Sequence, residues 1–151
     1  SGHAALKENH FLDDGAFLIA KILIETARLN EQNQLVTDLI NDLVEPSESK
    51  EYRFTIADTE FKQYGEHVLT ELNRAVAQID NWEAVEPNYE GVRVRCTSPD
   101  QDGWFLLRLS LHDPVMPLNV ESNIKNGVQS IVKQLTPLIR QFDKLDSSVL
   151  T

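Results

Sequence analysis

The chain has 151 residues with 14 basic and 24 acidic side chains, which gives a formal net charge of −10. This charge repels nucleic acid, and no cluster of lysine or arginine offsets it locally, so we expect no nucleic-acid partner. The composition, 41% hydrophobic and 25% charged, is typical of a soluble globular protein. The longest apolar runs are far too short to span a bilayer, so we expect no membrane partner.

Residues 1–45 predict a loop followed by two helices. Asp13-Asp14-Gly15 supplies N-cap residues for a first helix that runs to about Asn30. This helix is apolar on nearly every side, so it needs cover from both sides. The second helix, Gln34–Val44, has one apolar stripe and cannot supply that cover. We therefore interpret residues 1–45 as the remainder of a larger α/β domain whose sheet is missing.

A polar, proline-containing stretch, residues 46–50, is typical of a linker. Beyond it, the first strand is predicted at Tyr52–Ile56. An amphipathic helix follows, capped at Asp58 or Thr59 and carrying an apolar stripe as far as Ile79.

Three further strands are predicted from apolar residues, at Val92–Cys96, Trp104–Leu109 and Leu118–Ser122. The continuously apolar strand Trp104–Leu109 is expected to be central. A helix from about Asn123 to Phe142 closes the chain, and Pro137 should kink or divide it. The order β-α-β-β-β-α predicts that residues 51–151 form an α+β domain, a small antiparallel sheet with helices against one face.

The single cysteine, Cys96, allows neither an internal disulfide nor a multi-cysteine metal site. It alternates with Val92 and Val94 in a predicted strand, so we expect it to fill the core rather than act as a nucleophile. Trp82 and Trp104 are also expected in the core. The four histidines show no two-ligand helical spacing, so a zinc site is not expected. One cysteine and no visible signal peptide fit a reducing cytoplasm.

The residues with the clearest chemistry lie at and just beyond the end of the central predicted strand. Arg108, Ser110 and His112 alternate, so in an extended strand end all three would project to one side. A guanidinium, a hydroxyl and an imidazole converging there could hold a phosphate, the arginine through a bidentate fork and the others through single hydrogen bonds. The competing interpretation is a solvated strand end followed by a turn that happens to contain His112.

Two separated segments together resemble the C-terminal end of the α-D-phosphohexomutase family, which includes phosphoglucomutase and phosphomannomutase. The first segment is Ser1-Gly2-His3, followed by Lys7-Glu8-Asn9 and Asp13-Asp14-Gly15; it is similar to the family's sugar-recognition loop, Glu-x-Ser-Gly-His, and the helix start after it. The second runs from Gly103-Trp104 through residues 108–114, Arg-Leu-Ser-Leu-His-Asp-Pro. It is similar to a Gly-Trp strand that leads into a phosphate-binding loop, Arg-Pro-Ser-Gly-Thr-Glu-Pro.

The resemblance implies a domain assignment and a set of binding residues. Residues 1–45 would be the tail of the family's third domain, and residues 51–151 its last domain, with the missing N-terminal domains of the same chain as partners. Ser1 and His3 would contact the sugar of a phosphosugar substrate. Its phosphate would be bound by Arg108, Ser110 and His112.

The resemblance also implies an activity for the longer protein. The whole enzyme would be an isomerase that transfers a phosphoryl group on a hexose phosphate, with magnesium bound outside this chain and a hexose bisphosphate as intermediate. The family's phosphoserine nucleophile and magnesium loop belong to earlier domains. This chain alone is therefore expected to hold no catalytic residue and to be inactive. The identity of the hexose, glucose, mannose or glucosamine, stays open.

The second segment departs from the family loop at several positions. Leu109, Leu111 and His112 replace its proline, glycine and threonine, Asp113 replaces its glutamate, and Pro117 stands where an arginine usually follows. Leucine in place of glycine removes the close approach of backbone to phosphate. These departures favour an alternative function, a non-catalytic ligand-binding or protein-interaction module that kept the fold and lost the phosphate site.

Overall fold

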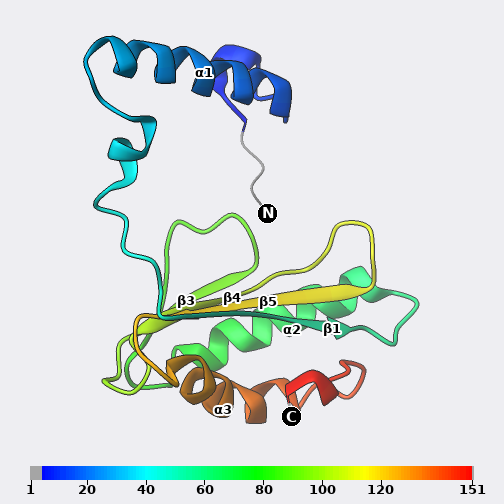
Figure 1. Ribbon diagram of the computed structural model, residues 1–151. Helices are drawn as coiled ribbons and strands as arrows, with labels where there is room; N and C mark the ends of the chain where they lie inside the picture. The colour runs from blue at the N-terminus through cyan, green and yellow to red at the C-terminus, as the bar shows by residue number, and fades with distance from the viewer. Residues whose placement is uncertain (1–4, 151) are drawn as a thin grey trace. The chain divides into compact units, whose positions relative to one another are not determined.

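The computed structural model describes residues 5–150 of the chain. It divides into two compact units, Ser1–Val44 and Glu45–Thr151. The α-helices and most of the strands are labelled in Figure 1. The boundary between the units falls at the start of a polar stretch that contains Pro46.

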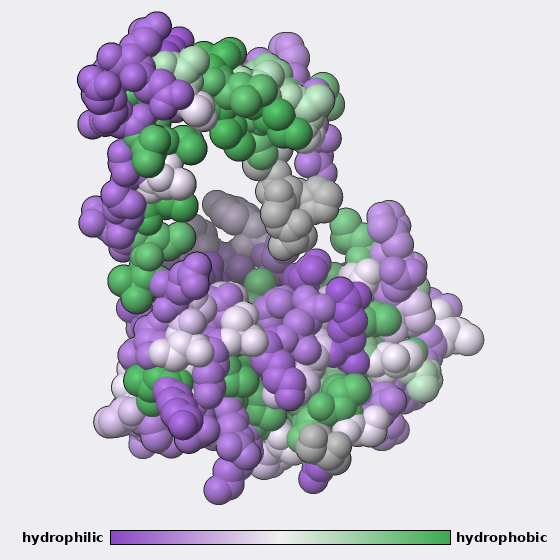
Figure 2. Space-filling model, in the orientation of Figure 1, coloured by the Kyte–Doolittle hydropathy of each residue, from purple (hydrophilic) through white to green (hydrophobic). Residues whose placement is uncertain are grey.

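The first unit is built on one long helix, α1 (Gly15–Glu31), between two short 3₁₀ helices, η1 (Lys7–Asn9) and η2 (Val36–Ile40). Asp14 caps α1, because its Oδ1 accepts a hydrogen bond from the N–H of Phe17 at 3.0 Å. The predicted start of this helix is therefore confirmed. Figure 2 shows apolar residues gathered over α1. Its large apolar side chains that stay exposed are Ile19, Ile22, Leu23 and Ile24.

The second predicted helix, Gln34–Val44, is wrong, because only Val36–Ile40 is helical and its turns are 3₁₀. The segment does not lack a helix start, since Asp38 Oδ2 accepts the N–H of Leu35 at 2.8 Å in a capping contact. Its apolar stripe, however, is largely exposed. Packing therefore does not offset the cost of nucleating an α-helix.

The second unit contains a five-stranded antiparallel sheet with the strand order β1-β5-β4-β3-β2. Its strands are β1 (Glu48–Thr55), β2 (Trp82–Ala84), β3 (Val92–Cys96), β4 (Gly103–Leu107) and β5 (Val115–Ser122). The predicted α+β class with an antiparallel sheet is confirmed. The continuously apolar strand, β4, is central, as predicted.

Several strand predictions need correction. β1 begins at Glu48, which pairs with Ser122, so residues 48–50 belong to the sheet rather than to the predicted linker. The predicted order also lacked β2, whose three residues are too few to show an alternating pattern. The observed order is β-α-β-β-β-β-α. As a regular strand, β4 ends at Leu107 rather than at Leu109.

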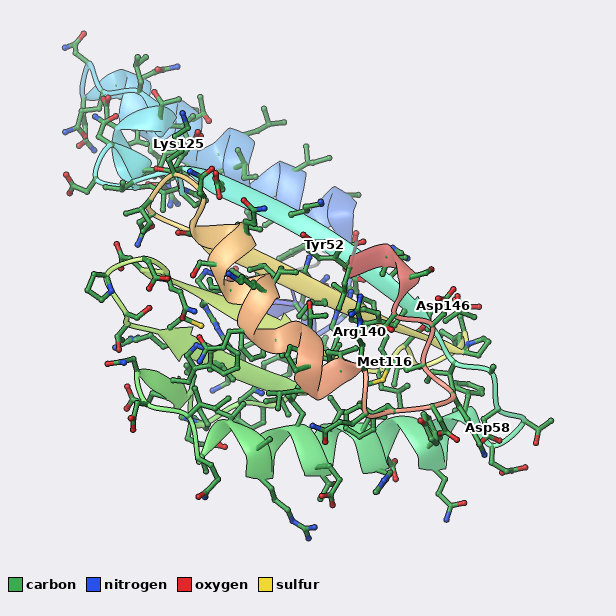
Figure 3. The ribbon with its side chains drawn as sticks, turned by 90° about the horizontal axis from the view of Figure 1, so that it is seen from below. Tyr52, Asp58, Met116, Lys125, Arg140 and Asp146 are labelled. Carbon is green, nitrogen blue, oxygen red and sulfur yellow. The ribbon has the colours of Figure 1, made fainter. Side chains whose placement is uncertain are left out.

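Helices α2 (Phe61–Val76) and α3 (Gly127–Ile139) contact each other and cover one face of the sheet (Figures 1 and 3). α2 begins later than predicted, because Asp58 Oδ1 accepts the N–H of Glu60 at 3.0 Å in a turn that precedes the helix. α3 also begins later than predicted. It continues through Pro137 and ends two residues beyond it, so the proline does not divide the helix.

The covered face of the sheet and the inner sides of α2 and α3 form the core. Its largest fully buried side chains are Phe54, Phe105, Leu107, Met116 and Leu118 from the strands and Leu72, Ile131, Leu135 and Ile139 from the helices.

No helix of the described part of this unit covers the opposite face (Figure 1). By strand register, the residues of that face include Glu51 and Arg53 on β1, Arg93 and Arg95 on β3, Trp104 and Leu106 on β4, and Asn119 and Glu121 on β5. We call them the helix-free face.

Candidate functional site: a hairpin at the end of the central strand

The segment that links β4 to β5, residues 108–114, forms a hairpin that prolongs the sheet. The N–H of Arg108 donates to the carbonyl of Pro117 at 3.1 Å, and the N–H of Ser110 donates to the carbonyl of Val115 at 3.0 Å. The antiparallel pairing of β4 with β5 therefore continues past Leu107. Arg108 and Ser110 are two residues apart in this extended segment, which places both side chains on the side of the helix-free face.

Leu109 points the other way and anchors the hairpin on α2. Its side chain packs against the core at Gly65, which is buried. A Cβ on Gly65 would lie only 2.5 Å from Leu109 Cδ1, so the contact depends on the glycine. Leu109 therefore fixes the height of the hairpin above the helix, and with it the positions of its two neighbours, Arg108 and Ser110.

A second glycine lets the start of β3 pass close beside Arg108. Gly91 has a φ of 68°, in the left-handed region that favours glycine. A Cβ there would lie 2.0 Å from the carbonyl oxygen of Leu107 and 2.7 Å from Arg108 Cα. Both backbone conformation and space therefore require glycine at this position.

Arg108 is half-buried and forms no ion pair within residues 5–150. Its charge acts on Glu51, on the helix-free face. Hydrogen bonds from Arg53 at 2.7 Å and from Asn119 at 3.1 Å are the main causes that lower the pKa of Glu51, and the charge of Arg108 adds to them. Since Glu51 is already held by these partners, the guanidinium of Arg108 keeps its hydrogen-bond donors available.

Ser110 and His112 differ in their surroundings. Ser110 is half-buried, and its Oγ accepts the N–H of Asp113 at 3.3 Å, which leaves the hydroxyl hydrogen free to donate. His112 lies at the exposed tip of the hairpin, beside Leu111, which is 76% exposed. The structure therefore brings Arg108 and Ser110 together on the hairpin and leaves His112 in solvent. A guanidinium and a hydroxyl donor side by side can hold an oxyanion.

The two predicted sugar-binding residues, Ser1 and His3, lie outside the described residues. Two of the polar residues that follow them, Glu8 and Asn9, are paired within the first unit. Glu8 forms an ion pair with Lys21 at 2.7 Å. The side-chain amide of Asn9 donates to Asp14 Oδ2 at 3.4 Å.

Three other kinds of candidate chemistry, a reactive cysteine, a metal cluster and a membrane-spanning helix, find no support among the described residues. Burial raises the pKa of the Cys96 thiol to about 12, so this residue fills the core, as predicted. Within residues 5–150, no group of three or more histidine, cysteine, aspartate or glutamate side chains could hold a metal ion. None of the described helices has the length and apolar character needed to cross a membrane.

The prediction that both tryptophans lie in the core is correct for Trp82 and wrong for Trp104. Trp82 lies in the core, as predicted, and donates its indole N–H to buried Gln101 at 2.8 Å. The prediction for Trp104 is wrong, because its side chain is half-buried on the helix-free face, with the Arg93 guanidinium 4.9 Å above its ring. The alternation of β3 would have indicated that Arg93 and Arg95 face outward together, but a strand alone does not reveal its neighbours.

Comparisons with known proteins support the fold. No family model matches the chain, and no curated protein matches it in sequence. A solved X-ray structure is similar in fold, that of a phosphoglucomutase/phosphomannomutase family protein from Burkholderia thailandensis, with a TM-score of 0.62 and 24% sequence identity. The match covers 93% of this chain and 26% of that protein, so the chain spans about a quarter of its length. At this identity the similarity establishes the fold.

Proposed function

We propose that this chain is the C-terminal part of a phosphohexomutase and that its hairpin, residues 108–114, helps to bind the phosphate of a hexose phosphate. The observation that carries the proposal is the position of Arg108, half-buried without an ion-pair partner in the described chain and next to the Ser110 hydroxyl. The fold of the solved phosphoglucomutase/phosphomannomutase family protein supports it. By resemblance to the family, magnesium would bind in another part of a longer protein.

The expected role of the hairpin is to hold the phosphate that is not transferred. Arg108 would bind two of its oxygens through parallel N–H donors, and Ser110 would donate to a third. These contacts would fix the orientation of the sugar relative to a reacting group supplied elsewhere in the longer protein. His112 would join them only if the tip of the hairpin folds toward the ligand, and its donor strength would rise when the imidazole is protonated.

One observation favours the alternative, a non-catalytic ligand-binding or protein-interaction module. Leu111, which stands where the family loop has glycine, is 76% exposed at the tip of the hairpin. Its side chain occupies space that a glycine would leave open to a phosphate. A large exposed apolar side chain is also a common anchor in protein interfaces.

Titration of the chain with glucose 1-phosphate, followed by amide and arginine side-chain NMR signals, tests the proposal. Signals from Arg108 to Asp113 should shift. Because a charge-assisted hydrogen bond contributes about 1.5–3 kcal/mol, Arg108→Ala should weaken binding by about tenfold to a little over a hundredfold. Arg74→Ala, which removes an arginine ion-paired with Glu71 on α2, is the matched control and should leave binding unchanged. If the parent chain shows no shift in the hairpin, the alternative function is favoured.

A further inference from the structure

The helix-free face contains two neighbouring arginines without carboxylate partners. Arg28, Arg53 and Arg74 each form an ion pair, at distances between 2.6 and 3.5 Å. Arg93 and Arg95 form none within residues 5–150. Arg108 and Arg140 also lack an ion pair among the described residues, so what sets Arg93 and Arg95 apart is that they are adjacent on one face.

Strand pairing places these two arginines together. Val92, Val94 and Cys96 of β3 are buried in the core, so the alternate residues Arg93 and Arg95 share the opposite face. Their Cα atoms are therefore separated by roughly 6.6 Å, two residues of a strand. Arg95 lies opposite Glu83 of β2 in the register. Glu83 is exposed and no ion pair joins the two side chains, so the glutamate does not neutralise Arg95.

Trp104 holds one of the two guanidiniums in place. It lies opposite Arg95 on β4, and the guanidinium carbon of Arg93 lies 4.9 Å from the centre of its ring. Such stacking uses the face of the guanidinium and leaves its N–H edges free to bind an oxyanion. The side chain of Arg93 is thus oriented before any ligand arrives, which lowers the entropy lost on binding.

The same residues line an open surface hollow of about 400 Å³, similar in volume to other surface hollows of this unit. Its lining consists of Val85, Arg93, Arg95, Cys96, Thr97, Asp102, Gly103, Trp104 and Asn123. Asp102 is the one carboxylate among these lining residues, while Glu83, opposite Arg95, and Glu121, opposite Trp104, stand beside the hollow on the same face. An aromatic ring beside two cations suits a small ligand that carries both an oxyanion and an apolar ring face.

We propose that the hollow beside Arg93, Arg95 and Trp104 is a second oxyanion subsite, separate from the hairpin, and that it takes a phosphate monoester. Arg93 lies opposite Leu106 on β4, and Arg108 follows two residues later on the same side of the sheet, so these two arginines are diagonal neighbours. The guanidinium of Arg93 lies over the Trp104 ring, which is about 13 Å from Arg108 between Cα atoms. The two sites therefore lie on one side of the sheet without sharing a cation. The subsite does not depend on the function proposed for the hairpin.

The indole N–H signal of Trp104 in NMR spectra is the natural probe. The chain contains two tryptophans, and the other, Trp82, is buried with its N–H donated to Gln101, so it serves as an internal reference. Titration with inorganic phosphate and then with glucose 1-phosphate, at constant ionic strength, should shift the Trp104 signal and leave that of Trp82 in place. A larger response to the sugar phosphate would show that the ring face contributes as well as the phosphate.

Matched variants identify the cations responsible. Arg93→Gln with Arg95→Gln should weaken the phosphate-dependent shift of Trp104 at least tenfold. Arg53→Gln removes an arginine of the same face that is ion-paired with Glu51 and should have no effect. Arg108→Gln should also leave the Trp104 response intact.

Three results would overturn the proposal. One is a Trp104 signal that does not move with phosphate up to the order of 10 mM, a range that covers weak binding. Another is an equal shift when chloride replaces phosphate at the same ionic strength. The third is loss of the Trp104 response in Arg108→Gln, which would show one site rather than two. Absence of shifts in the hairpin, with the Trp104 response retained, would count against the proposed function alone.

Discussion

The contact between Gly65 and Leu109 should make substitutions at the two positions strongly coupled. A Cβ at position 65 would lie 2.5 Å from Leu109 Cδ1, so Gly65→Ala forces Leu109 to turn away. Alanine in a helix is favoured over glycine by about 1 kcal/mol. The lost packing and strain around Leu109 should exceed that gain and leave the variant destabilised by about 1–2 kcal/mol.

The second substitution, Leu109→Ala, removes a partly buried leucine from the core edge and should cost about 2–3 kcal/mol. In the double variant, the new methyl group at position 65 meets no leucine and fills part of the vacated space. The helix-propensity gain of alanine is then realised. The double variant should therefore be more stable than the sum of the single effects predicts, by about 2–3 kcal/mol, because both the clash and its masking of the helix-propensity gain disappear.

Urea unfolding of the four proteins, followed by tryptophan fluorescence, measures this coupling. The amide signals of Arg108 and Ser110 report on the hairpin itself and should move in Gly65→Ala, because Leu109 lies between them. Effects that add within about 0.5 kcal/mol would refute the claim that Leu109 anchors the hairpin on α2.

Three further predictions concern the body of the second unit. Gln101→Leu should destabilise the second unit by about 2 kcal/mol in thermal melts, because the buried Trp82 N–H loses its acceptor. If Gln101→Leu costs as much in a Trp82→Phe background, the lost hydrogen bond to Trp82 is not the reason. Cys96, whose pKa is raised to about 12 by burial, should react with a thiol reagent only in denaturant, and reaction of the native protein at the rate of a free thiol would contradict this. The pKa of Asp58 is lowered, chiefly by the hydrogen bond from Lys144, so its contribution to stability is present above the ordinary carboxyl pKa and lost as the pH falls through the folded-state pKa. Lys144→Met should therefore destabilise the fold at neutral pH and match the parent in strong acid, and a pH-independent difference in urea unfolding would exclude the ion pair as its source.

The fold class and the central strand were predictable because the signals are local. The run Trp104–Leu107 is continuously apolar, and the structure places it in the middle of the sheet. The alternation of Val92–Cys96 marked a strand with one buried face. In contrast, β2 has three residues, and the segment 34–44 depends on what packs against it, so neither could be predicted from residue patterns.

The candidate sites were predictable only in part, because they depend on strand register. The spacing of Arg108 and Ser110 on one extended segment indicated that they share a side. Nothing in the sequence indicated that Glu51, far earlier in the chain, would lie opposite Asn119 and come within the field of Arg108. The pairing of β3 with β4, which brings Arg93 over Trp104, is likewise a property of the assembled sheet.

The most direct measurement of the central claim is a crystal structure of the chain with glucose 1-phosphate, in a lattice that leaves residues 108–114 free of neighbouring molecules. We expect the phosphate beside the hairpin, with its oxygens about 2.7–2.9 Å from the guanidinium of Arg108 and one oxygen accepting from Ser110. A structure with the hairpin empty at saturating ligand, or with the phosphate held by residues that include neither Arg108 nor Ser110, would contradict the assignment of the hairpin as a phosphate site.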